Sequence, residues 1–161
     1  MAQNGVFTPP AIGRNDMSPL LRRTSMKAFM ASIFGMGVLR FLLTLSGLPD
    51  STVKYFSMSA VIILGTLYFA VTTPTHRDRL HAAFFLIIPY MIVEVAALAY
   101  TWATGHRTIF HSADYSMGFS PLQHTLGHLA GGLTWEPLIL FILMEVVWGI
   151  YTLAGRLFAR T

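Results

Sequence analysis

An almost wholly apolar run at residues 26–48 determines the class of this chain. It is about 20 residues long, the length that a helix needs to cross the roughly 30 Å hydrocarbon core of a bilayer. Arg40 lies well inside this run, where a cation is costly unless it meets a partner or water. Two acidic residues, Glu94 and Glu145, also lie deep in apolar runs. The chain therefore resembles a membrane protein with a charged interior rather than a soluble domain.

Composition agrees with the membrane class. The chain is 54% hydrophobic and only 11% charged, whereas charged residues make up about 25% of an ordinary soluble domain. It contains no cysteine, which excludes disulfides, thiolate metal sites and Fe–S clusters. Its net charge of +4 does not indicate a nucleic-acid partner, because the lysines and arginines gather at the ends of the apolar runs. We expect the lipid bilayer to be the main partner.

The chain divides into a polar tail and a set of apolar spans. We predict an irregular cytoplasmic tail over residues 1–25 and one transmembrane domain over residues 26–161. The spans are expected at about residues 26–48, 53–73, 80–103 and 135–158. Short connections between consecutive spans favour an antiparallel bundle of four transmembrane helices, so the predicted fold is an all-α integral membrane protein.

The long connection at residues 104–134 contains the signals of one further short helix. Ser120, Pro121 and Gln123 match an N-cap, a proline at the first helical position and a side chain that reaches back to the cap. Leucines follow at helical spacing, at positions 122, 126, 129 and 133, with polar residues on the rest of the wheel. This pattern predicts an interfacial helix that lies on the outer membrane surface.

The distribution of cations predicts the orientation. Eight lysines and arginines lie near one set of span ends and two near the other. The larger group is Arg14, Arg22, Arg23, Lys27, Arg77, Arg79, Arg156 and Arg160, and the smaller is Lys54 and Arg107. Since cytoplasmic loops carry the excess of Lys and Arg, both termini should be cytoplasmic and residues 104–134 should lie on the outer face.

Arg40, Glu94 and Glu145 are the candidate catalytic residues. Their positions along the spans place them at similar depth, so we predict that Arg40 pairs with at least one of the two carboxylates. Such a cluster could carry protons or act as acid and base on a lipophilic substrate. The alternative is an ion pair that only fixes the register of the helices.

A group of outer histidines is the candidate metal site. His124 and His128 are four residues apart, which places both imidazoles on one helical face, and His111 with Asp114 could complete a Zn or Cu(II) shell. The alternative is that these side chains bond only to water, lipid headgroups or loop carbonyls. No other cofactor is expected.

Two functions remain open from the sequence. The first is an accessory or scaffold subunit that assembles with other membrane subunits or with copies of itself. The second is binding, proton-coupled transport or acid–base conversion of a small lipophilic or cationic molecule in a cavity between the spans, with Trp148 and Tyr90 as candidate ligand-binding residues. The sequence does not decide whether the protein is an enzyme. An open cavity at Glu94 and Glu145 would favour the second function, and a closed ion pair would favour the first.

Overall fold

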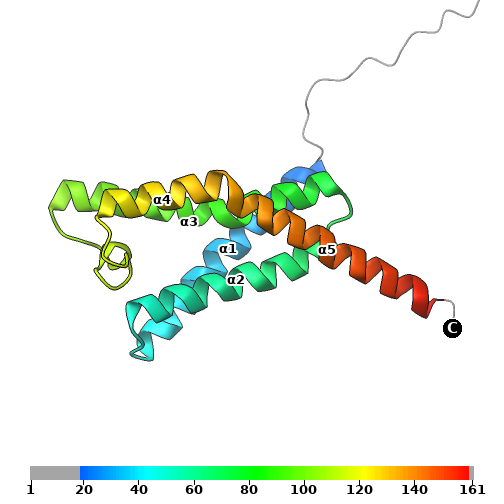
Figure 1. The fold of residues 1–161 in the computed structure, drawn as a ribbon, viewed down its shortest axis with the longest axis horizontal. Coiled ribbons are helices and arrows are strands. Elements are labelled where there is room, and N and C mark those ends of the chain that lie inside the picture. The colour runs from blue at the N-terminus through cyan, green and yellow to red at the C-terminus, as the bar shows by residue number, and fades with distance from the viewer. Residues whose placement is uncertain (1–18, 160–161) are drawn as a thin grey trace, which may run out of the picture.

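The computed structural model describes residues 19–159, and all the regular structure in that range is helical. The helices are α1 (Pro19–Leu45), α2 (Asp50–Thr72), α3 (His76–Thr104), the short 3-10 helix η1 (Ile109–His111), α4 (Pro121–Leu133) and α5 (Trp135–Phe158) (Figure 1). Four helical segments are long and apolar enough to cross a membrane: one each in α1, α2 and α3, and one that runs through α4 and α5. The all-helical class and the presence of four helical segments that could cross a membrane are therefore confirmed, and the fourth segment begins earlier than the predicted residue 135.

Helix α1 begins earlier than the sequence indicated. Residues 19–25, expected to be irregular, form its first turns, and Pro19 suits this place because a proline at the first helical position loses no backbone hydrogen bond. The rest of the predicted tail, residues 1–18, lies outside the described residues. The turn after α1 contains Gly47 at φ 74°, a left-handed conformation that glycine adopts without strain.

Helix α3 is central to the packing. It contacts α1, α2, α4, α5 and η1. Figure 1 shows α4 and α5 following one another almost as a single rod, with α4 beside α3, while the hairpin of α1 and α2 crosses at an angle and opens away from α4. The loop between α3 and α4 folds into that opening, where Asp114 Oδ2 accepts a hydrogen bond from the Ser51 amide at 2.6 Å.

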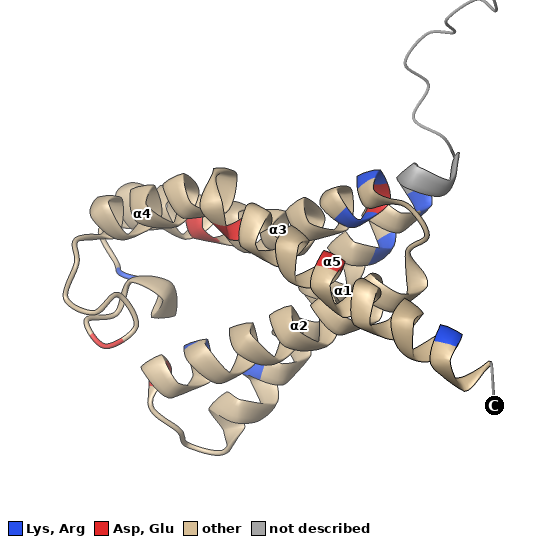
Figure 2. Cartoon of the chain, turned by 45° about the vertical axis from the view of Figure 1, so that its right-hand side comes forward, with Lys and Arg blue, Asp and Glu red and all other residues tan. Residues whose placement is uncertain are grey.

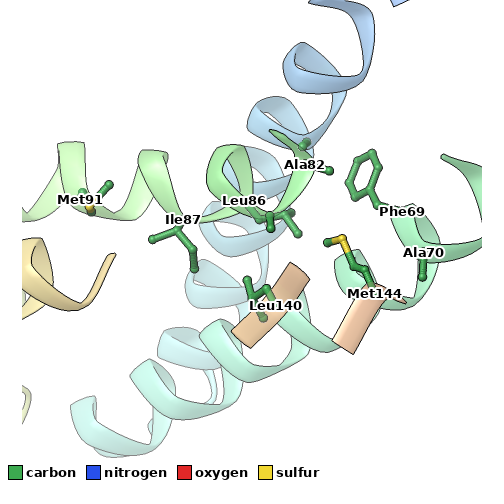
Figure 3. Packing of buried hydrophobic residues seen from close by; sticks show 10 residues of the cluster. Phe69, Ala70, Ala82, Leu86, Ile87, Met91, Leu140 and Met144 are labelled. Atoms are coloured by element: carbon green, nitrogen blue, oxygen red, sulfur yellow. The ribbon is translucent and has the colours of Figure 1, made fainter. Parts of the chain in front are cut away.

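The apolar core lies where α1, α2, α3 and α5 meet. Phe69, Leu86, Leu140 and Met144 are buried there together with small alanines (Figure 3). Gly65 lets α2 approach α3 closely, since a Cβ at this position would lie 2.9 Å from a Leu86 methyl carbon. The helices therefore pack through apolar side chains in this half of the molecule. The polar groups described below lie in the other half.

The outward-facing surface is strongly apolar. Phe34, Phe41 and Leu64 are each at least 60% exposed, and many other large apolar side chains of the helices face outward in the same way. Figure 2 shows few charged residues along the helices, with a concentration of Lys and Arg near the start of α1 and the start of α3. An exposed apolar surface of this extent is typical of helices surrounded by lipid.

A candidate metal centre between α3 and α4

Glu94 has the most unusual environment of the described acidic residues. It lies in the second half of α3, is fully buried, and neither of its carboxylate oxygens has a hydrogen-bond partner among the described residues. A buried carboxylate is unfavourable unless hydrogen bonds or an opposite charge compensate for its lost hydration. The groups nearest to it are histidines, which form ion pairs with Glu94 only when they are protonated.

Histidine side chains surround the Glu94 carboxylate. Glu94 Oε2 lies 3.6 Å from His111 Nε2 and 3.7 Å from His124 Nε2. The ligand atoms of Glu94, His124 and His128 all lie within 4.8 Å of one another, and His124 Nε2 is itself buried without a hydrogen-bond partner. We call Glu94, His111, His124 and His128 the Glu94 cluster.

Two of the separations in the Glu94 cluster are close to those of ligands around an ion. At 3.6 and 3.7 Å the nitrogen and oxygen atoms are too far apart for a direct hydrogen bond. Two ligand atoms that each lie about 2.0–2.1 Å from a tetrahedral ion are about 3.4 Å apart. A small adjustment of the side chains would thus place Glu94, His124 and His128 around one metal ion.

The local sequence of α4 explains why its histidines face Glu94. The capping box predicted from Ser120 and Gln123 is present and fixes the start of the helix. Gly132 brings α4 close to α3, since a Cβ at this position would lie 2.5 Å from Met91 Sδ and 3.0 Å from Ile87 Cγ2. His124 lies eight residues earlier on the same helix. It also faces α3 and is only 6% exposed.

Three of the four leucines of α4 face away from the protein. Leu122, Leu126 and Leu133 are 43%, 54% and 62% exposed, whereas His124 and Thr125 are buried. The fourth leucine, Leu129, packs against the apolar core. The helix places its polar side toward the interior and its apolar side outward, as expected where the surroundings are lipid.

His111 reaches the cluster from η1. It is fully buried, and its Nε2 lies 3.2 Å from Thr125 Oγ1, while its Nδ1 lies 3.4 Å from Thr101 Oγ1. Burial lowers the pKa of His111 below the usual value, so the ring is neutral at neutral pH. A neutral imidazole can donate a hydrogen bond to Glu94 or offer a lone pair to an ion.

Tyr90 contacts His128 and orients its ring within the cluster. Its hydroxyl lies 3.2 Å from His128 Nε2, and the two rings meet edge to face with centroids 4.9 Å apart. Metal-binding histidines commonly have such an outer partner that fixes the orientation of the ring. Of the two predicted ligand-binding residues, Tyr90 thus lies at the site.

Arg40 does not pair with either glutamate, so that prediction is wrong. Within residues 19–159 the only hydrogen bond of its guanidinium joins Nε to Ser57 Oγ at 3.1 Å. The group is surrounded instead by the rings of Tyr90, Phe110 and Tyr115, with centroids 5.1–5.6 Å from Cζ. Aromatic faces attract a cation through their quadrupoles, which offsets part of its burial cost.

Glu145 takes part in a separate ion pair with Arg79. Arg79 Nε lies 2.7 Å from Oε1 and Nη2 lies 3.1 Å from Oε2, a bidentate arrangement, and Nη1 donates to the Thr73 carbonyl at 2.7 Å. The Trp148 ring covers the Arg79 guanidinium at 4.5 Å, so this tryptophan belongs to the ion pair and not to the Glu94 cluster. Sequence reasoning missed Arg79 because it was counted only as a cation at a span end.

Asp114 is also separate from the Glu94 cluster. Its carboxylate bonds to the first turn of α2, through the Ser51 amide described above. The structure therefore brings the predicted histidines together with Glu94, and it places Asp114, the carboxylate predicted beside them, elsewhere. Glu94 and the histidine face of α4 lie at a similar depth, and this could have indicated Glu94 as the carboxylate of the group. That inference needed the knowledge that α3 and α4 lie side by side.

A pocket of about 540 Å³ leads to the histidines of α4. His124, His128 and Gly127 form one wall, the start of α2 with Lys54 another, and Met117 on the loop between α3 and α4 a third. The volume lies within the usual range of small-molecule sites. A water molecule or a small ligand could therefore reach an ion held by the cluster.

No protein-family model, curated protein sequence or solved structure matches this chain. Function is accordingly inferred from the geometry of the Glu94 cluster and its pocket.

Proposed function

We propose that this protein is an integral membrane protein that binds one divalent transition-metal ion, preferably Zn²⁺, through Glu94, His124 and His128. The observation that carries the proposal is the buried Glu94 carboxylate, which has no hydrogen-bond partner among the described residues and offers a ligand atom within 4.8 Å of ligand atoms of His124 and His128. Imidazole nitrogen and carboxylate oxygen are ligands that suit Zn²⁺, and a cysteine-free chain offers no thiolate alternative.

The proposed ion would keep a position for an exogenous ligand. Three protein ligands with a fourth, open position are typical of catalytic zinc sites, whereas structural sites are closed by four protein ligands. The pocket beside His124 and His128 gives that open position access to a small molecule. We therefore favour binding or conversion of a small molecule in this pocket over a purely structural metal site.

The accessory-subunit hypothesis is better suited to Glu145 than to Glu94. Glu145 forms a bidentate pair with a fully buried arginine, which is what a register-fixing ion pair requires. Glu94 has no such partner among the described residues. The two acidic residues that the sequence grouped together thus support different roles, and only Glu94 supports a binding function.

The orientation proposed with this function places both termini in the cytoplasm and residues 104–134 on the outer face. The supporting observation is the excess of Lys and Arg at the opposite span ends. The pocket then opens toward the outer side of the membrane, because its third wall is formed by the loop between α3 and α4.

The proposal is tested by metal binding to the purified protein. After removal of metal with a chelator, titration with Zn²⁺ followed by calorimetry and elemental analysis should give one ion per chain. Glu94→Gln and the double change His124→Ala with His128→Ala should each abolish stoichiometric binding. His106→Ala is the matched control, because His106 is exposed outside the cluster and should bind no ion. Absence of bound zinc in the unchanged protein, or full binding in Glu94→Gln, would refute the proposal.

A further inference from the structure

A second cavity lies between α1 and α3, and Tyr90, which contacts His128 of the Glu94 cluster, also borders this cavity. It has a volume of about 250 Å³ and is bordered by apolar groups that include Met36, Pro89 and Val93. Arg40 is the only charged residue among the described residues that border it. We call this space the Arg40 cavity. A narrow apolar cavity with one cation suits a ligand with an alkyl chain and an anionic end.

The guanidinium of Arg40 has unused hydrogen-bonding capacity. Its Nε donates to Ser57, but its terminal nitrogens have no hydrogen-bond partner within residues 19–159, and Nη2 is buried. Aromatic rings around it offset charge without accepting these N–H bonds in good geometry. A carboxylate matches the fork of an arginine, because two parallel N–H···O bonds can form at once.

A second cation and a hydroxyl group lie close to the aromatic rings around Arg40. Lys54 is nearly fully buried, and its Nζ donates to the Tyr115 carbonyl at 3.0 Å and lies 4.4 Å from the centroid of the Tyr115 ring. The Arg40 Cζ lies 5.5 Å from the centroid of the same ring. The hydroxyl of Tyr115 is buried without a hydrogen-bond partner among the described residues. Two cations and a donor without a hydrogen-bond partner are therefore grouped around Tyr115.

We propose that the Arg40 cavity binds a long-chain fatty acid, with the carboxylate at Arg40 and the alkyl chain between α1 and α3. The cavity volume of about 250 Å³ is below the usual 300–1,000 Å³ of drug-sized ligand sites, so the cavity holds the carboxyl end of one chain, and the rest of the chain extends into the surrounding lipid. Ile33 and Val93 at its border are 41% and 38% exposed, so the chain can enter from the surrounding lipid. The inference does not depend on the metal ion.

Native mass spectrometry of the delipidated protein in detergent tests this inference. Palmitate is the probe, and methyl palmitate is its uncharged counterpart. We expect one palmitate per chain and binding of the methyl ester weaker by about tenfold or more, because hydrogen bonds between charged groups are lost. Arg40→Gln should weaken palmitate binding to the same extent while stoichiometric zinc binding, measured separately, is retained.

A second variant keeps Arg40 and fills the cavity. Gly37 borders it, and a Cβ at this position would have no neighbour within 4 Å, so Gly37→Leu should occupy the space of the chain without a clash and abolish palmitate binding. Gly149→Leu is the matched control, since that position is equally open and lies on α5 away from the cavity. Equal binding of palmitate and its ester, unchanged binding in Gly37→Leu, or displacement of palmitate by an equimolar two-chain anionic phospholipid would overturn the inference.

Discussion

Glu94 and Glu145 are chemically identical side chains in apolar helices, yet their carboxylate oxygens differ in their hydrogen-bond partners. Both oxygens of Glu145 accept hydrogen bonds from Arg79, whereas neither oxygen of Glu94 has a partner among the described residues. Removing one partner of a buried pair leaves the other charge uncompensated, while removing an unpaired buried charge relieves an unfavourable burial. The same substitution should therefore have opposite effects at the two positions.

Stability of the metal-free protein measures this difference. Glu145→Gln should lower the free energy of unfolding by up to about 3 kcal/mol, because Arg79 is fully buried and would lose its counter-ion. Glu94→Gln should leave the free energy of unfolding unchanged or raise it. Thermal unfolding in detergent with a chelator present would show both. A loss at Glu94 as large as that at Glu145 would mean that Glu94 is also a structural ion-pair partner.

The helices themselves were largely predictable, and their rotation about their own axes was not. The capping signal at Ser120 correctly marked the start of α4, because such signals depend on residues only a few positions apart. The pairing of Arg40 was predicted from its depth along the span, which leaves open the direction in which the side chain points. That direction depends on how α1 crosses α3, and the sequence of α1 alone does not contain it.

The orientation of α4 could not be predicted from its periodicity. Hydrophobic periodicity identifies two faces of a helix, but it assigns the apolar face to the interior only when the surroundings are water. Leu126 is exposed and His124 is buried, so the polar face is the buried one here. His124 and His128 could still be recognised as a candidate pair, because their spacing of four residues places them on one face in either case.

Close packing of α4 on α3 should be required for metal binding. Gly132→Val would place new carbon atoms against Met91 and Ile87, and relief of this overlap would move α4 and its histidines away from Glu94. We expect zinc affinity to fall about tenfold or more. Ala130→Val on the exposed side of the same helix is the control, with affinity unchanged. Calorimetric titration of both variants checks the result, and equal affinities would show that the helix contact does not position the ligands.

The arrangement of the whole molecule in the membrane can be tested because the chain has no cysteine of its own. Ala113 lies in the loop between α3 and α4 and Ala159 follows α5, and both are exposed. In intact cells, Ala113→Cys should react with a membrane-impermeant thiol reagent and Ala159→Cys should react only after the membrane is opened, since the Lys and Arg distribution places the C-terminus inside. The reverse pattern would show that the orientation is inverted.

The rod formed by α4 and α5 is longer than a membrane is thick. Residues 121–158 comprise 38 residues, which at 1.5 Å each extend about 57 Å, against a hydrocarbon layer of roughly 30 Å. The excess of about 27 Å corresponds to about five helical turns, so it requires a strong tilt or a position of most of α4 among the lipid headgroups. In both cases the depth of His124 and of the neighbouring Glu94 in the membrane depends on the thickness of the bilayer. The access of water to the site should therefore change with the acyl-chain length of the surrounding lipids.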